Sequence, residues 1–228
     1  QWFPKMPADN PSLTASALCV VDPTPPADGP LPPVKTIADC LLSNLPDGWN
    51  PAAYQDEKGR PVIALSPESS DKLSQLRSLC ERALRKGADE HGLILSIGFA
   101  SAESGTDSLP ALYERALRAL EEKFYRGPGR VFSNSGLRPA KSPTLDRTAF
   151  LLGLNSGDIA VCSAGVEAYF SAAAKDFLSP HLVRLAAFEA AAMIFDTHRE
   201  ADDTGQPSEE QDFVSRIYAM ETRAQVQD

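Results

Sequence analysis

The stretch from Leu93 to Phe132 constrains the fold more than any other part of the sequence, because it combines two strand patterns with a helix pattern. It begins with an apolar run of β-prone residues that only Ser96 and Gly98 interrupt. A second, shorter β-prone run starts at Val131. We therefore expect two strands of one sheet, with Ser96 as an ordinary sheet residue.

An amphipathic helix is predicted between these two strands. Ser108 can cap its first turn, and Pro110 suits the position after the cap. Apolar residues then recur at helical spacing on one face: Leu109, Leu112, Ala116, Leu120 and Phe124. A Gly-Pro-Gly sequence at 127–129 ends the helix. We expect the basic residues Arg115, Arg118 and Lys123 on its solvated face.

The upstream residues predict a further strand, helix, hairpin and helix. The apolar run 13–21 predicts a strand, and a loop rich in proline follows to residue 33. A helix is expected over 34–45, and a hairpin over 52–55 and 62–65. Ser69 or Ser70 can cap the next helix, and Gly87 is expected to end it; its apolar stripe is Leu73, Leu76, Cys80, Ala83 and Leu84.

These elements follow the order β-α-β-β-α-β-α-β, which predicts an α+β domain with an antiparallel-dominated, ferredoxin-like sheet over residues 1–137. Residues 138–228 form a second domain that is only helical, after a polar boundary at 136–143. Helices are expected over 145–154, 159–174 and 180–198. The third has an apolar face of Leu182, Leu185, Ala186, Ala190, Met193 and Ile194, and a fourth has a stripe of Phe213, Ile217 and Met220.

The sequences SIGFAS, ERALRAL and FYRGPGRV occur in the order and spacing of the C-terminal half of GGDEF-type nucleotidyl cyclase domains, which this segment resembles. The Phe-Tyr-Arg-Gly at the helix end is similar to the degenerate GGDEF-like domain of AraC-type two-component response regulators. The resemblance implies a cyclase-like fold in a bacterial, cytoplasmic transcription regulator. It also implies a receiver domain and DNA-binding helix-turn-helix motifs of the same protein beyond this sequence, joined through the helical region.

The residues that a working GGDEF enzyme needs are largely missing. The resemblance places the first metal-binding acid at Asp22 and the next at the hairpin, where Asp56 and Glu57 stand. Gln55 and Lys58 occupy positions where the family has glycine and an aromatic residue. We expect no catalytic, cofactor-binding or metal-binding residues. The alternatives are a divergent diguanylate or nucleotidyl cyclase that uses Asp22 with Asp56 or Glu57, and a nucleotide sensor without turnover.

Composition excludes several other classes. The net charge of −9 disfavours direct binding to nucleic acid, and no apolar run is long enough to span a membrane. Cys19, Cys40, Cys80 and Cys162 have no paired spacing, so we expect buried free thiols in a reducing cytoplasm. His91, His181 and His198 make no metal-ligand spacing with them. Both ends of the sequence are interpreted as cut from a longer protein, and self-association is expected through the helical part.

Overall fold

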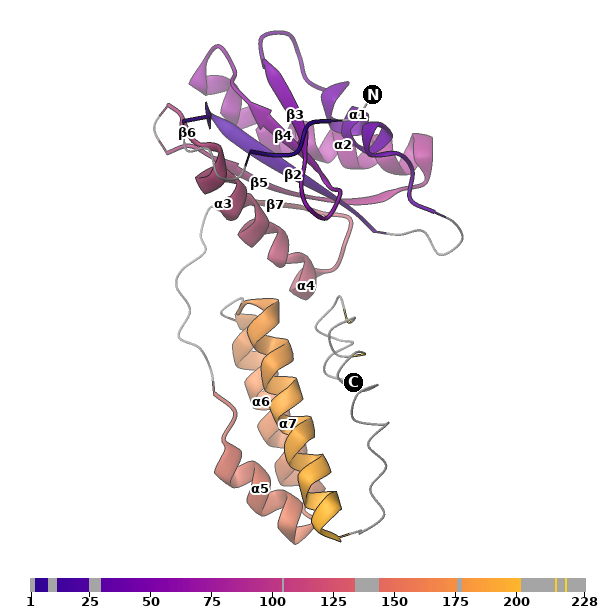
Figure 1. Ribbon diagram of the computed structural model, residues 1–228, viewed down its shortest axis with the longest axis vertical. Coiled ribbons are helices and arrows are strands. Elements are labelled where there is room, and N and C mark those ends of the chain that lie inside the picture. The colour runs from indigo at the N-terminus through magenta and orange to yellow at the C-terminus, as the bar shows by residue number, and fades with distance from the viewer. Residues whose placement is uncertain are drawn as a thin grey trace. The chain divides into compact units, whose positions relative to one another are not determined.

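A computed structural model describes residues 3–7, 12–24, 30–103, 105–133, 144–175 and 178–201, together with Arg216 and Met220 (Figure 1). The chain divides into two compact units, Gln1–Leu137 and Arg138–Asp228. The first unit combines helices with a sheet, and the described part of the second unit is helical.

The first unit is built on a mixed sheet of five strands in the order β3-β4-β2-β5-β7. All neighbours are antiparallel except β5 and β7, which are parallel. The strands are β2 (Ala17–Thr24), β3 (Pro51–Gln55), β4 (Pro61–Leu65), β5 (Ile94–Ser101) and β7 (Val131–Ser133). Two further strands of two residues each, β1 (Thr14–Ala15) and β6 (Asp107–Ser108), pair with each other. The predicted α+β class is thus confirmed.

Helices cover both faces of this sheet (Figure 1). Alternate strand residues such as Cys19 and Ile97 pack against α1 (Val34–Leu42) and α2 (Leu76–His91). The intervening residues, such as Leu18 and Val20, pack against α3 (Leu109–Glu121) on the other face. A short helix α4 (Lys123–Arg126) follows α3. Because both faces of the central strands are covered, β2 is buried over residues 17–21 without alternation.

The local signals for α3 are confirmed. The Ser108 hydroxyl accepts a hydrogen bond from the amide of Ala111 at 3.4 Å, and the predicted apolar stripe is buried. The helix is interrupted at Glu122, so Phe124 lies in α4 rather than in a continuous α3. Gly127 ends α4 with φ at +77°, a conformation that favours glycine.

Three predicted boundaries in the first unit are wrong. Strand β2 continues through Asp22 and Pro23 to Thr24, because beyond Val20 only β5 pairs with it and proline is tolerated beside an unpaired edge. Helix α1 ends at Leu42 rather than at residue 45. A 3-10 helix, η1 (Ser70–Gln75), precedes α2, and neither Ser69 nor Ser70 caps α2 with its side chain.

Gly87 does not end the second helix. It lies inside α2, where a Cβ atom would come within 2.7 Å of Leu95 Cδ1. The helix continues to His91 and ends at Gly92, which has φ at +63°. Close packing of helix on strand, and not a positive φ, therefore accounts for the glycine at position 87.

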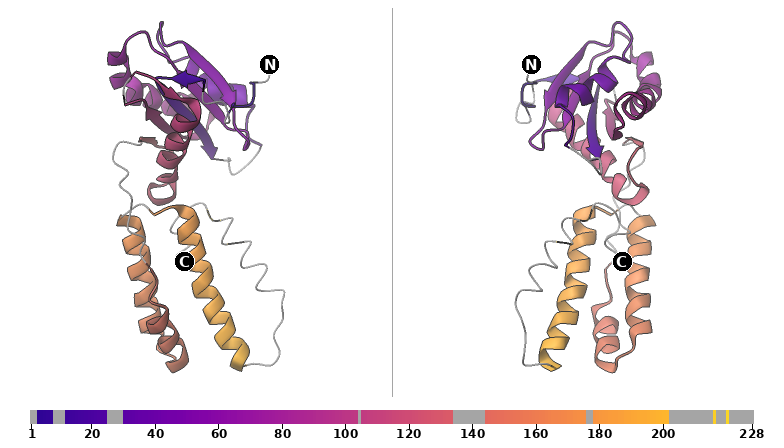
Figure 2. Two further views of the ribbon diagram at one scale, coloured as in Figure 1. Left: turned by 60° about the vertical axis from the view of Figure 1, so that its left-hand side comes forward. Right: turned by 90° about the vertical axis from the view of Figure 1, so that its right-hand side faces the viewer.

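The second unit contains α5 (Arg147–Ser156), α6 (Ile159–Lys175) and α7 (Pro180–Ala201) (Figure 2). Tyr169 and Phe170 of α6 are buried. The predicted apolar face of α7 is wrong in part: Leu182, Leu185 and Ile194 are exposed, whereas Met193 is buried as predicted, together with Val183 and Ala191.

The fourth predicted helix lies outside the described residues except for Arg216, which is helical, and Met220, whose carbonyl oxygen accepts a hydrogen bond from Arg184 Nε at 3.1 Å. Within the described part of the chain, no helix combines the length and the hydropathy needed to cross a bilayer.

Candidate functional site

The two acids singled out by the sequence, Asp22 and Asp56, lie at the same end of the sheet. Strand pairing places Asp22 opposite Ser96 of β5 and Val20 opposite Val62 of β4. Continuing the β2–β4 register by two residues brings Arg60 beside Asp22. Asp56, Arg60, Asp22 and Ser96 thus follow one another across β3, β4, β2 and β5, and we call these four residues the polar row.

Asp56 is enclosed by donors from its own hairpin. Its Oδ1 accepts hydrogen bonds from the backbone amides of Lys58 at 3.0 Å and Arg60 at 2.8 Å. Its Oδ2 lies 2.7 Å from both Nε and Nη2 of Arg60, and it accepts a hydrogen bond from the Tyr113 hydroxyl at 3.1 Å. Only 2% of the Asp56 side chain is exposed. Both carboxylate oxygens are therefore engaged by groups of the protein itself.

Asp22 is paired with two cations. Lys123 Nζ lies 2.9 Å from Asp22 Oδ2, and Arg60 Nη1 lies 3.9 Å from Asp22 Oδ1. Arg60 therefore bridges the two acids, and Lys123 covers Asp22 from α4. With two carboxylates and two cations, this cluster has no net formal charge.

The pKa values of two neighbours fit this arrangement. Burial by itself would lower the pKa of Arg60, but the hydrogen bond and charge of Asp56, together with the charge of Asp22, raise it overall. Burial raises the pKa of Tyr113, and the negative charge of Asp56 raises it further. Arg60 therefore stays charged and Tyr113 stays protonated at neutral pH, as their contacts with Asp56 require.

Close packing of α3 on β5 brings Tyr113 and Lys123 over the sheet. A Cβ atom at Gly98 would lie 2.3 Å from the carbonyl oxygen of Ala116, so α3 approaches β5 to a distance that only glycine permits. The other end of the row is closed by Ser96, whose buried hydroxyl accepts a hydrogen bond from the Gly129 amide at 3.2 Å. The sheet role predicted for Ser96 is confirmed, with an added contact to the 127–129 turn.

Glu57 is not part of this cluster: it is exposed in the hairpin turn, which Gly59 completes with φ at +79°. Among the described residues, no group of three or more histidine, cysteine or acidic side chains is arranged to hold a metal ion. The contacts within the row are charge pairs and hydrogen bonds between groups of the protein.

Sequence reasoning missed three members of the site: Arg60, Tyr113 and Lys123. The solvated face predicted for Lys123 is wrong, since only 13% of its side chain is exposed. Arg115 also pairs, with Asp107. The spacing of Tyr113 and Lys123 could have indicated that they face the sheet. Both lie at steps of three or four residues from Ala116 and Leu120 of the buried stripe.

The cysteines and histidines add no second site. All four cysteines are free, and Cys19, Cys40 and Cys80 are buried as predicted, whereas Cys162 is half-buried. Cys19 Sγ and Cys80 Sγ lie 3.9 Å apart. The contact with Cys80, followed by burial, raises the pKa of Cys19, which keeps this thiol protonated. His91 and His181 are exposed, and the side chain of His198 lies outside the described residues.

No protein-family model matches this chain, and no curated protein matches it.

Proposed function

We propose that this chain is a non-catalytic regulatory and interaction region of an AraC-type transcriptional response regulator in the bacterial cytoplasm. It would relay a signal, self-associate, or do both, and act on DNA-binding helices outside this sequence without binding nucleic acid itself. The observation that carries the non-catalytic assignment is the pairing of Asp22 and Asp56 with Arg60 and Lys123.

The arrangement of the sheet supports a ferredoxin-like, cyclase-like origin. The sequence β2-α1-β3-β4-α2-β5 forms four antiparallel strands in the order β3-β4-β2-β5, with α1 and α2 on one face. This is the split β-α-β pattern expected of such folds. β7 then extends the sheet next to β5, after the helix and Gly-Pro-Gly turn on which the resemblance to degenerate GGDEF-like domains is based.

One observation favours the alternative of a divergent nucleotidyl cyclase or a nucleotide sensor: Asp22 and Asp56 share one end of the sheet and are bridged by a single guanidinium. A metal ion at these carboxylates would have to displace Lys123 and Arg60. Displacement would break these largely buried ion pairs, which costs several kcal/mol in general. Glu57 is exposed and could not replace Asp56 without a rearrangement of the hairpin.

The proposed relay has a structural basis in the first unit. Lys123 and Tyr113 bind α4 and α3 to acids of β2 and the hairpin, and Ser96 binds the following turn to β5. That turn leads into β7 and, in the sequence, into the helical unit. A change in the polar row would therefore act on the segment that precedes the second unit.

The proposal is tested by incubating the purified chain with GTP and either magnesium or manganese and separating the products by chromatography. We expect no cyclic dinucleotide, and no heat of GTP binding in calorimetry. Turnover that is lost in the Asp22→Ala variant would establish the enzyme instead. Binding of GTP without turnover would establish the nucleotide sensor.

A further inference from the structure

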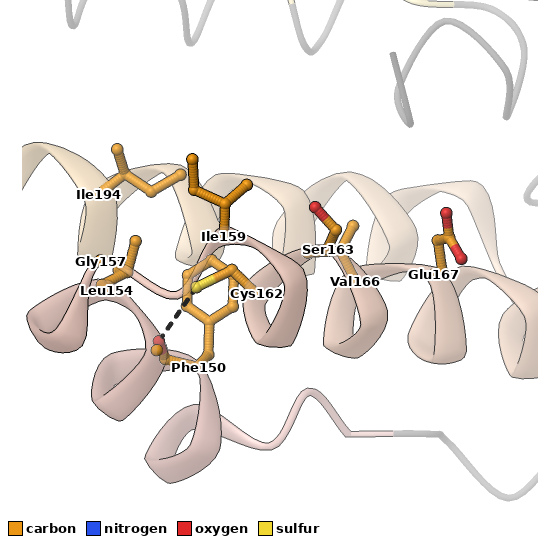
Figure 3. A pocket seen from close by; sticks show the side chains of 10 residues that line it. Phe150, Leu154, Gly157, Ile159, Cys162, Ser163, Val166, Glu167 and Ile194 are labelled. Carbon is orange, nitrogen blue, oxygen red and sulfur yellow. Dashed lines mark hydrogen bonds between the residues drawn. The ribbon is translucent and has the colours of Figure 1, made fainter.

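The second unit has an open groove between its helices, lined mainly by Phe150 and Leu154 of α5, Ile159, Cys162 and Val166 of α6, and Ile194 of α7 (Figure 3). Its volume is about 550 Å³. The Cys162 thiol donates to the Phe150 carbonyl oxygen at 3.6 Å and ties α5 to α6 beside the groove. We call these six residues and the space between them the α5–α6 groove.

Two side chains of the α5–α6 groove also project into solvent. Ile159 is 78% exposed, the highest value for any large hydrophobic residue that the structure describes, and Ile194 is 38% exposed. Residues 159–168 of α6 include no buried position, although eight of them are apolar or glycine. A large apolar side chain and an apolar recess therefore lie on the same patch of surface.

The patch carries almost no charge. Residues 148–166 contain a single charged side chain, Asp158, whose Oδ1 accepts a hydrogen bond from the Val161 amide at 3.2 Å. Glu167, the one charged residue lining the groove, lies about two turns along α6 from Ile159. Because the whole chain has a net charge of −9, two copies that meet on such an uncharged surface bring the fewest like charges together.

We propose that the α5–α6 groove is the surface through which two copies of this chain associate, with Ile159 of each copy entering the groove of the other. A two-fold symmetric contact requires one patch that complements itself, and a projecting isoleucine beside an apolar recess meets this requirement. The inference rests on the self-association in the proposed function, for which it names the surface.

Sedimentation of the 228-residue chain over a range of concentrations tests this contact. Ile159→Glu and Ile194→Glu should each weaken dimerisation about ten-fold or more, because each places an uncompensated charge in the contact. Ile159 begins α6, where an acidic side chain is favourable to the helix, so unfolding would not explain its effect. Ile94→Glu is the matched control, since Ile94 is 53% exposed on β5 of the first unit, and it should leave dimerisation unchanged.

Cys162 gives an independent measurement. It is the one cysteine of the chain that is not buried, so a bulky maleimide should modify it first. Its rate of modification should fall as the protein concentration rises, and modified protein should stay monomeric. If both glutamate variants still dimerise as the unchanged chain does, the proposed dimer surface is wrong. The non-catalytic assignment would not be affected by that result. The proposed dimer surface is also wrong if the chain is monomeric at every concentration. It is equally wrong if the groove binds only another protein or lipid vesicles.

Discussion

Arg60 and Asp56 form the most deeply buried ion pair among the described residues, with 15% and 2% of their side chains exposed. We expect Arg60→Met to lower the free energy of unfolding by about 3–5 kcal/mol, because it leaves the carboxylate of Asp56 buried without its cation. Urea unfolding measures this loss. Glu81→Gln is the control: its pair with Arg77, in which both side chains are 51% exposed, should contribute no more than about 1 kcal/mol. Equal effects of the two variants would contradict the burial of the polar row.

The pH dependence of stability reports on Tyr113. Its pKa is raised in the folded protein by burial and by Asp56, so the folded state holds this proton more tightly than the unfolded state. The resulting stabilisation is fully present below the ordinary tyrosine pKa of about 10 and is lost as the pH rises through the higher folded value. We therefore expect the free energy of unfolding to fall above about pH 10, and to fall less steeply in Tyr113→Phe. Tyr169, whose pKa burial also raises, contributes in the same direction and requires Tyr169→Phe as a parallel variant.

At the scale of elements, the packing of α3 on β5 decides the position of the polar row. Gly98→Ala should destabilise the first unit by about 1–3 kcal/mol, since its methyl group would meet the backbone oxygen of Ala116. Leu120→Ala should cost about 2–5 kcal/mol by opening a cavity on the same contact. Gly165→Ala, where a Cβ atom meets nothing within 4 Å in α6, should not destabilise the chain. Thermal or urea unfolding measures the stability of the three variants. If Gly98→Ala leaves the stability unchanged, α3 does not approach β5 so closely.

Most elements of the first unit could be predicted because their signals are local. Ser108 and Gly127 mark the start of α3 and the end of α4, and alternation of apolar residues with breakers marks the strands. The role of Gly87 could not be predicted in this way. A glycine near the end of a helix pattern usually ends the helix, whereas Gly87 is required by its close contact with Leu95 of the sheet. The predicted face of α7 is wrong in part for a similar reason: its alanine-rich sequence offers several apolar faces, and only tertiary packing selects one.

The candidate site was less predictable than the fold. Asp22 and Asp56 could be proposed from their places after a strand and in a hairpin turn. Their partners could not, because Lys123 is 101 residues from Asp22 and Tyr113 is 57 residues from Asp56 along the chain. A basic residue on a helix is usually solvated, and only the close approach at Gly98 brings Lys123 onto an acid of the sheet.

At the scale of the whole molecule, the two compact units predict separable folding. A chain that ends at Leu137 should remain folded, because the apolar cores on both faces of the sheet are made within the first unit. Circular dichroism and urea unfolding of this shortened chain check the prediction, with light scattering to follow its association. A cooperative transition and a monomeric state are expected. An unfolded or insoluble product would show that the units share one core.

The central claim is that Arg60 and Lys123 occupy the carboxylates that a nucleotidyl cyclase would use for metal. Titration with manganese, followed by nuclear magnetic resonance of the backbone amides, tests it most directly, because this paramagnetic ion broadens the signals of residues near its binding site. We predict that the amides of Asp22, Lys58 and Arg60 broaden no more than those of exposed acidic surfaces elsewhere in the chain. Selective, saturable broadening at these three amides that disappears in Asp22→Asn would contradict the account.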